Sequence, residues 1–172
     1  MPIVGADLVE RYSGGASNTD PTASLGGAIS TVAGGIITDN TTHEVWDVVS
    51  SAESSAGDTE YRCIYLQNSH GTLTLQNAAV YIDTQTPSSD TVIAIGLGTS
   101  AVNGTEQTVG DESTAPSGVT FTELTGSGNA LNIGNIPAGE HKALWLRRIV
   151  SSSASAANDD SYVLAYTGDT AA

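Results

Sequence analysis

The clearest pattern of apolar and polar positions lies between Glu60 and Asp83, where two extended runs meet across a short turn. Residues 61–67 are dense in β-branched, aromatic and aliphatic side chains, and a second run follows over residues 72–83. The residues between them, Asn-Ser-His-Gly at 68–71, have the composition of a turn. The pattern predicts that the two runs form the central hairpin of a β-sandwich.

The second run changes phase partway along its length. Leu73 and Leu75 share one face of a strand, whereas the next apolar set, which begins at Ala78, is one step out of phase with them. Because side chains alternate strictly along a strand, a slip of one residue indicates a β-bulge. We expect this bulge near Asn77.

Further strand signals recur along the chain without a helical period. They lie at residues 36–38, 43–50, 91–97, 119–124, 130–136, 140–150 and 161–167, separated by polar and glycine-rich segments. Seven to nine short strands at regular spacing are typical of an all-β fold. The predicted fold is an antiparallel β-sandwich, either immunoglobulin-like or a jelly roll, with long polar loops.

The first 35 residues differ from the rest. Residues 1–11 form an extended apolar arm, able to add to a sheet edge or to lie on a neighbouring molecule, and residues 12–35 are almost all small and polar. We therefore divide the chain into an N-terminal arm and Gly/Ser-rich loop, residues 1–35, and a β-sandwich domain, residues 36–172. The predicted partner-binding residues of the arm are Ile3, Val4, Leu8, Val9, Arg11 and Tyr12.

The net charge of the chain limits the classes of molecule that it is expected to bind. The 172-residue chain fits one domain, carries a formal net charge of −14 and has only five basic residues. Such a balance disfavours nucleic acid and anionic membrane surfaces as partners. Three basic residues, Lys142, Arg147 and Arg148, share one predicted strand. They indicate either edge protection and salt bridges to loop acids or a docking stripe, to which Arg147 and Arg148 would contribute.

Recognised catalytic and metal-binding motifs are missing from the sequence. Cys63 lies in an apolar run and is expected to be a buried, inert thiol. His43, His70 and His141 do not have metal-ligand spacing. Acid pairs in two loops could bind calcium, but loop acids facing water are the plainer interpretation; the pairs are Asp111 with Glu112 and Asp159 with Asp160.

Two enzymatic or ligand-binding alternatives remain open at this stage. A pair of distant carboxylates for glycoside hydrolysis cannot be identified from spacing. A sugar-stacking platform is possible, although the aromatic candidates lie in predicted strands, which favours packing; they are Trp46, Trp145, Tyr61, Tyr65, Tyr81, Tyr162 and Tyr166. We expect a protein that is not an enzyme and that binds no cofactor and no metal.

Several segments resemble small virion structural proteins of tailed bacteriophages. They span most of the chain and comprise the glycine-rich run over residues 12–30, Glu60-Tyr61-Arg62-Cys63, Leu73-Thr74-Leu75-Gln76-Asn77, Pro137-Ala138-Gly139-Glu140 and Trp145-Leu146-Arg147-Arg148. The resemblance implies a capsid decoration or cement protein on the outer capsid surface of the virion, made in the host cytoplasm. It further implies a homo-oligomer, with a trimer favoured, that binds the major capsid protein. The alternative within this class is a tail, baseplate or host-recognition module.

Overall fold

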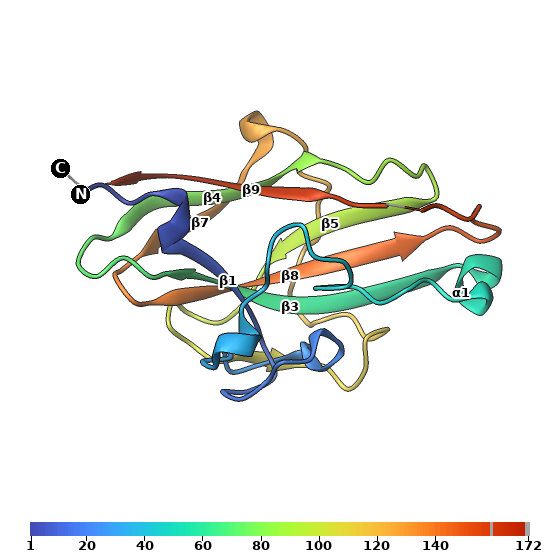
Figure 1. Ribbon diagram of the computed structural model, residues 1–172, viewed down its shortest axis with the longest axis horizontal. Helices are drawn as coiled ribbons and strands as arrows, with labels where there is room; N and C mark the ends of the chain where they lie inside the picture. Colours follow the sequence, from blue (N-terminus) through green and yellow to red (C-terminus); the bar gives the residue numbers. More distant parts are fainter. Residues whose placement is uncertain (159, 171–172) are drawn as a thin grey trace.

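The computed structural model describes residues 1–158 and 160–170, and within them the fold is all-β (Figure 1). One α-helix, α1 (Ser51–Ala56), and four short 3-10 helices accompany the strands. The strands are β1 (Leu8–Tyr12), β2 (Gly26–Gly27), β3 (Asp58–Asn68), β4 (Leu75–Thr84), β5 (Thr91–Leu97), β6 (Glu106–Thr108), β7 (Leu131–Ile136), β8 (His141–Val150) and β9 (Val163–Thr170).

Two sheets form the sandwich. The large sheet has the strand order β1-β3-β8-β5, and the three-stranded sheet has the order β7-β4-β9. All strand pairs are antiparallel, so the predicted antiparallel β-sandwich is confirmed. A separate pair, β2 with β6, lies outside the two main sheets. Among the described residues, no helix is long and apolar enough to cross a membrane.

Strand β3 is the centre of the large sheet and is buried on both faces. Ile64 and Leu66 point into the core between the two sheets, whereas Cys63 and Tyr65 point to the opposite face. The adjacent strand β8 shows the same alternation. Leu144 lies in the inter-sheet core, whereas Ala143 and Trp145 on either side of it pack on the opposite face of the sheet. Burial on both faces explains why residues 61–67 are almost continuously apolar.

The predicted central hairpin is wrong, because β3 and β4 belong to different sheets. The buried side chain of Asn68 fixes the connection between them: its Nδ2 atom donates hydrogen bonds to the carbonyls of Leu73 and Ile136, at 2.8 and 2.9 Å. These bonds hold the largely exposed connection on a path that leads from one sheet to the other instead of turning back beside β3. The bulge expected near Asn77 is confirmed, since the register of β4 shifts between Leu75 and Ala78 and Asn77 has a φ of 50°.

Four of the other strand predictions match β5, β7, β8 and β9, and three do not. Residues 36–38 and 119–124 each make only an isolated bridge, and residues 43–50 form no strand. Some of their apolar side chains, among them Ile37, Val45 and Leu124, pack on the sandwich from irregular backbone, and Trp46 is buried in the inter-sheet core. Residues 51–56, which lie between two predicted strands, form α1, whose capping box joins Ser50 and Glu53.

The extended N-terminal segment pairs with its own chain. Of the two alternatives for this segment, β1 takes the sheet edge, where it lies antiparallel to β3 with Tyr12 opposite Ile64. Ile3 and Leu8 pack against the inter-sheet core. The pairing makes residues 8–12 an integral part of the large sheet.

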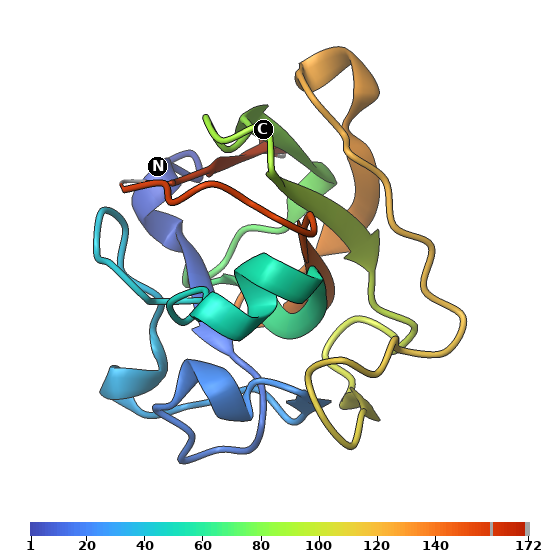
Figure 2. The same ribbon diagram turned by 90° about the vertical axis from the view of Figure 1, so that its right-hand side faces the viewer.

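The face of the large sheet that points away from the core is covered by a lobe, which we define as residues 13–35 and 99–122. These two segments lie side by side below the sandwich, blue and yellow in Figures 1 and 2, and are joined by the β2–β6 pair. The hydroxyl of Tyr65 donates to the carbonyl of Gly27 at 2.5 Å and accepts from the amide of Glu106 at 2.9 Å. One side chain of the large sheet therefore ties both segments in place.

Candidate functional site

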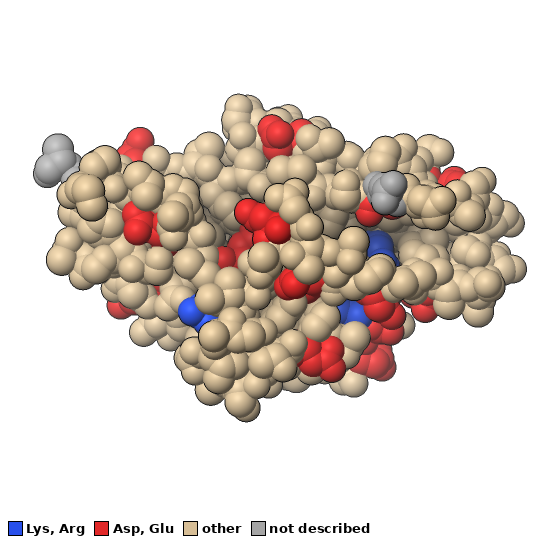
Figure 3. Space-filling model, viewed as in Figure 1, with Lys and Arg blue, Asp and Glu red and all other residues tan. Residues whose placement is uncertain are grey.

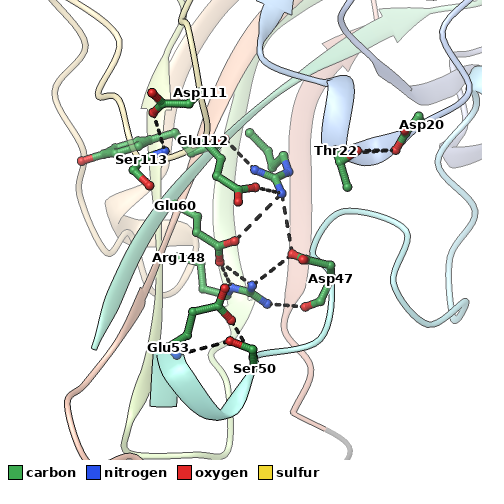
Figure 4. A network of polar contacts seen from close by, with 12 residues as sticks. Asp20, Thr22, Asp47, Ser50, Glu53, Glu60, Asp111, Glu112, Ser113 and Arg148 are labelled. Atoms are coloured by element: carbon green, nitrogen blue, oxygen red, sulfur yellow. Dashed lines mark hydrogen bonds and ion pairs between the residues drawn. The ribbon is translucent and has the colours of Figure 1, made fainter. Parts of the chain in front are cut away.

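The largest group of interacting charges among the described residues is an ion cluster, which we define as Asp47, Glu60, Arg62, Glu112 and Arg148 (Figure 4). Glu60 and Arg62 come from β3, and Arg148 of β8 lies directly opposite Glu60 in the register. Because these side chains share the face of Ile64, they continue the inter-sheet core at one end. Asp47 and Glu112 reach the cluster from the two flanking loops.

Arg148 binds the deepest acid of the cluster. Its Nε atom lies 2.5 Å from Oε2 of Glu60, a residue that is only 1% exposed. Its Nη1 donates to the backbone carbonyl of Asp47 at 2.8 Å, and its Nη2 lies 3.4 Å from the Asp47 carboxylate. The segment that precedes α1 is thereby attached to β8.

Arg62 lies at the centre of the three carboxylates and is fully buried. Its Nη2 atom is 2.5 Å from Glu112, 3.7 Å from Asp47 and 4.0 Å from Glu60. The ring of Trp46 packs against both guanidinium groups, with its centroid 5.5 Å from Cζ of Arg62 and 5.1 Å from Cζ of Arg148. Both cations therefore contact the same aromatic ring, and they share the carboxylates of Asp47 and Glu60.

The three carboxylates have ligand atoms close enough together to hold a metal ion. However, the guanidinium of Arg62 contacts all three of them, so it already supplies the positive charge that a metal would bring. Burial raises the pKa of Glu60, against the opposing influence of Arg148 and Arg62. Such opposing effects of burial and of nearby cations are typical of an internal ion pair at the end of a core. The arrangement of the cluster is therefore suited to holding the surrounding segments together.

A second polar contact ties the lobe to the sandwich. Lys142 donates from Nζ to the carbonyl of Gly98 at 2.9 Å and also to the carbonyl of Ser100. Glu106 accepts from the Thr99 hydroxyl at 2.9 Å and from the Ser100 amide at 2.8 Å. Burial alone would raise the pKa of Glu106, but these hydrogen bonds outweigh it and lower the pKa to about 2.

The predicted partner-binding residues of the N-terminal segment are mostly engaged within the chain. Arg11 donates to the Gln67 side chain at 2.7 Å and to the carbonyls of Ser30 and Val32. Tyr12 is buried, and its hydroxyl donates to Glu44 at 2.7 Å. Val9 is half-buried in β1, and of the apolar residues predicted there only Val4 is largely exposed.

The basic residues of β8 do not form one stripe. Arg148 belongs to the ion cluster on the inter-sheet face, whereas Arg147 points to the opposite face, where its guanidinium lies over the ring of Phe121. Lys142 is buried. Since β8 is a central strand of the large sheet, none of the three protects a sheet edge. The structure thus supports the salt-bridge alternative for Arg148.

The other candidate residues are dispersed. Cys63 is fully buried, and burial raises the pKa of its thiol. Asp111 accepts hydrogen bonds from its own loop, at Ser113 and Thr114, and Asp160 accepts from the amide of Ser88. Asp159 lies outside the described residues. The three histidines lie in separate segments, and the two tryptophans, Tyr61 and Tyr65 are buried in the cores, as packing predicts.

A polar depression of about 270 Å³ lies where the lobe meets the ends of β3 and β8. Arg11, Gln67, Asn103 and His141 contribute to its lining. Burial lowers the pKa of His141, whose ring stands edge-on to Tyr65. The depression therefore contains mainly neutral hydrogen-bonding groups and the already engaged Arg11.

Sequence reasoning missed most of the ion cluster. A visible signal was the pair of charges at Glu60 and Arg62, two residues apart in an apolar strand, which places both on one buried face. Asp47 and Glu112 gave no such signal, because loop folding brings them there. Comparisons with known protein families, curated proteins and solved structures find no match.

Proposed function

We propose that this protein is a non-enzymatic structural subunit that binds a larger protein assembly through its lobe, and that this assembly is the capsid of a tailed bacteriophage. The observation that carries the proposal is the low number of charged groups on the surface of the lobe. Its segments contain four acids and no basic residue: Asp20, Glu106, Asp111 and Glu112. Glu106 is buried and Glu112 pairs with Arg62, so only two isolated carboxylates remain on the lobe surface.

A rigid surface with few charges is suited to lying against another protein. Charged groups are costly to desolvate, so interface centres are depleted of them. The lobe is also held in one conformation by its own chain: Asn18 donates to the Ser13 carbonyl at 2.6 Å and accepts from the amide of Asp20 at 2.9 Å. Little conformational entropy would be lost when such a surface binds.

The capsid is proposed as the partner because of the resemblance to virion structural proteins. On a symmetric shell, many copies each making modest contacts give strong total attachment. In this proposal the protein assembles as a homo-oligomer, a trimer by that resemblance, and contacts the major capsid protein on the outer surface. The charged remainder of the sandwich faces solvent.

The proposal is tested by introducing charge on the lobe. Ala23 and Ala115 are exposed lobe residues, and Ala52 on α1 is an exposed position outside it. Capsids from a phage strain that lacks the gene are mixed with purified wild-type, A23E, A115E or A52E protein, and bound protein is measured by co-sedimentation. We expect at least about tenfold weaker binding for A23E and A115E, because a buried unpaired charge costs more than ~1.4 kcal/mol.

The A52E variant is the matched control and should bind like the wild type. Equal binding by all four proteins would show that the lobe is not the contact surface. Failure of the wild type to bind would show that the capsid is not the partner. Electron microscopy of intact virions then counts the copies. Hundreds of copies fit decoration, whereas a few or a few dozen would assign the protein to the tail.

A further inference from the structure

Both edges of the large sheet are closed by other parts of the chain. At β1, the amide of Ile37 donates to the carbonyl of Glu10 at 2.9 Å. At β5, the side-chain amide of Gln85 bonds to both backbone groups of Ile93, at 2.8 and 3.0 Å, and Thr122 pairs with Ile95. Unpaired backbone groups at these two edges are therefore few.

The edges of the three-stranded sheet differ from each other. Strand β7 has six residues and is irregular, and its Gly134 amide is bonded by the side chain of Asn132 at 2.8 Å. Strand β9 has eight residues. Its pairing with β4 contains two bulges, and in both of them the extra residue lies on β4 and not on β9. The outer edge of β9 is thus long and regular.

No backbone hydrogen bond among the described residues reaches that outer edge. The nearest is a bond from the Ile3 amide to the side chain of Thr170, at the end of the strand. In Figure 1, β9 runs in front of β4, and no other segment crosses in front of its middle. Val163 is 49% exposed, Thr167 is exposed, and the strand has neither Lys nor Pro. Over residues 163–167 the strand therefore carries neither a charge nor a proline that would prevent strand addition.

The surroundings of this edge are acidic. Asp169 is exposed within β9, and Asp160 precedes the strand. The hydroxyl of Tyr166 donates to Glu10 at 2.6 Å, and the exposed Asp39 lies near both residues. Figure 3, which looks onto β1 and β9, shows many acidic and few basic side chains on this face. A strand added here would be favoured by positive charge.

A second copy of this chain cannot supply that charge. Arg62, Lys142 and Arg148 are buried, Arg11 is engaged by Gln67 and two carbonyls, and Arg147 lies over Phe121 on the lobe side of the large sheet. Symmetric pairing of two β9 strands would also bring their acidic ends together. The complementary partner is a different protein.

We propose that the outer edge of β9 binds an extended, lysine- or arginine-rich segment of a partner protein as an additional antiparallel strand. Backbone hydrogen bonds along residues 163–167 would supply most of the contact, and the acids around the edge would select basic side chains. This surface is distinct from the lobe, and the inference does not depend on the capsid being the partner.

The test uses the full chain and three ten-residue peptides. The first alternates lysine and valine, the second has glutamate in place of lysine, and the third is the lysine peptide with N-methylated alternate residues, which cannot complete a strand ladder. Amide hydrogen exchange of β9 is followed by NMR as each peptide is added. We expect slower exchange at residues 163–167 with the first peptide only, and weaker binding as salt is raised.

Two variants check the location. T167K places a like charge on β9, and T72K places the same charge on the exposed connection between β3 and β4. We expect at least fivefold weaker binding of the lysine peptide to T167K and unchanged binding to T72K. No protection at millimolar peptide, or equal binding of all three peptides, overturns the proposal. Protection of β9 that rises with protein concentration and without peptide also overturns it, in favour of a second copy.

Discussion

The two faces of the large sheet are buried by different means. One face packs against the regular three-stranded sheet, through aliphatic side chains such as Ile64, Ile95 and Leu144. The other packs against the irregular lobe, through Tyr65, Trp145 and a few aliphatic residues. Trp145 and Leu144 are both fully buried. Irregular backbone can therefore exclude water as completely as a sheet does.

The difference lies in how each cover satisfies its backbone. Strands in the three-stranded sheet bond to one another in regular ladders. The lobe combines scattered backbone bonds, such as that from the Thr31 amide to the Ala16 carbonyl, with bonds from individual side chains such as Asn18, Glu106 and Tyr65 of β3. Glycine in the large sheet also allows the lobe to approach closely: a Cβ on Gly96 of β5 would lie 2.4 Å from Val119 of the lobe. We expect the lobe face to be as important for stability as the inter-sheet face, and more sensitive to single polar or glycine substitutions.

The largest effect is expected from removing the main side chain on each face. Trp145→Ala should lower the free energy of unfolding by about 3–5 kcal/mol, and Leu144→Ala by about 2–5 kcal/mol, because both leave cavities in packed regions. Urea denaturation measures both. A loss below 1 kcal/mol for Trp145→Ala, with a normal loss for Leu144→Ala, would show that the lobe face is only loosely covered. The exposed Val48 provides a control, since Val48→Ala should change stability by less than ~0.5 kcal/mol.

Arg62→Met removes the central cation of the ion cluster, at one end of the inter-sheet core. It should lower the free energy of unfolding by about 3–5 kcal/mol. The reason is that Asp47 and the buried Glu60 then keep only Arg148, while Glu112 loses the one cation that pairs with it among the described residues. Thermal unfolding with and without 5 mM calcium provides the second measurement. We expect calcium to leave the wild-type Tm unchanged, and a clear rise in the wild-type Tm would contradict the assignment of Arg62 as the resident cation.

A smaller effect, specific to the lobe, is expected at Gly26. Its φ is 94°, and a Cβ there would lie 1.8 Å from the carbonyl oxygen of Gln107. Gly26→Ala should therefore cost at least about 1–3 kcal/mol. Gly128→Ala is the matched control, because nothing lies within 4 Å of its added methyl group and its φ is not positive. Denaturation midpoints that are equal for the two variants would mean that the lobe can shift to accept a side chain.

The smallest effect concerns pH. The pKa of Glu106 falls from an ordinary 4.5 to about 2 on folding, so its ionised form stabilises the fold at higher pH. That contribution is present above pH 4.5 and is lost as the pH falls from about 4.5 to about 2. We expect Glu106→Gln to show a shallower loss of stability across this range than the wild type, measured by urea denaturation at several pH values. Glu123→Gln, at an exposed site, should keep the wild-type slope.

The sequence was informative where burial follows a strand period. The alternation over β4 located its bulge, and the apolar runs located β5, β7 and β8 closely. Alternation reports which side chains are buried and not which backbone groups pair, so it misassigned residues 43–50. It also could not show that β3 and β4 separate, because a turn composition fits both a hairpin and a crossing between sheets. Helix α1 was detectable from Ser50 and Glu53, which form its capping box.

The candidate site was less predictable than the fold. Glu60 and Arg62 stand in a strand whose burial the sequence indicates, so their pairing is a consequence of alternation. Asp47 and Glu112 reach them from irregular segments, and no local pattern fixes where those segments run. The sequence also did not predict that the lobe is well ordered. Its order depends on contacts such as that between Asn18 and Ser13, which no pattern in a run of small residues indicates.

The position of β3 between β1 and β8 has a consequence for synthesis. One neighbour of β3 precedes it in the chain, but the other begins only at His141, so most of the polypeptide must leave the ribosome before the sheet can close. Until then the apolar faces and one long edge of β3 are uncovered, a situation that slows folding and promotes aggregation. The nascent chain is therefore expected to depend on chaperones, and its yield to fall when translation stalls before β8.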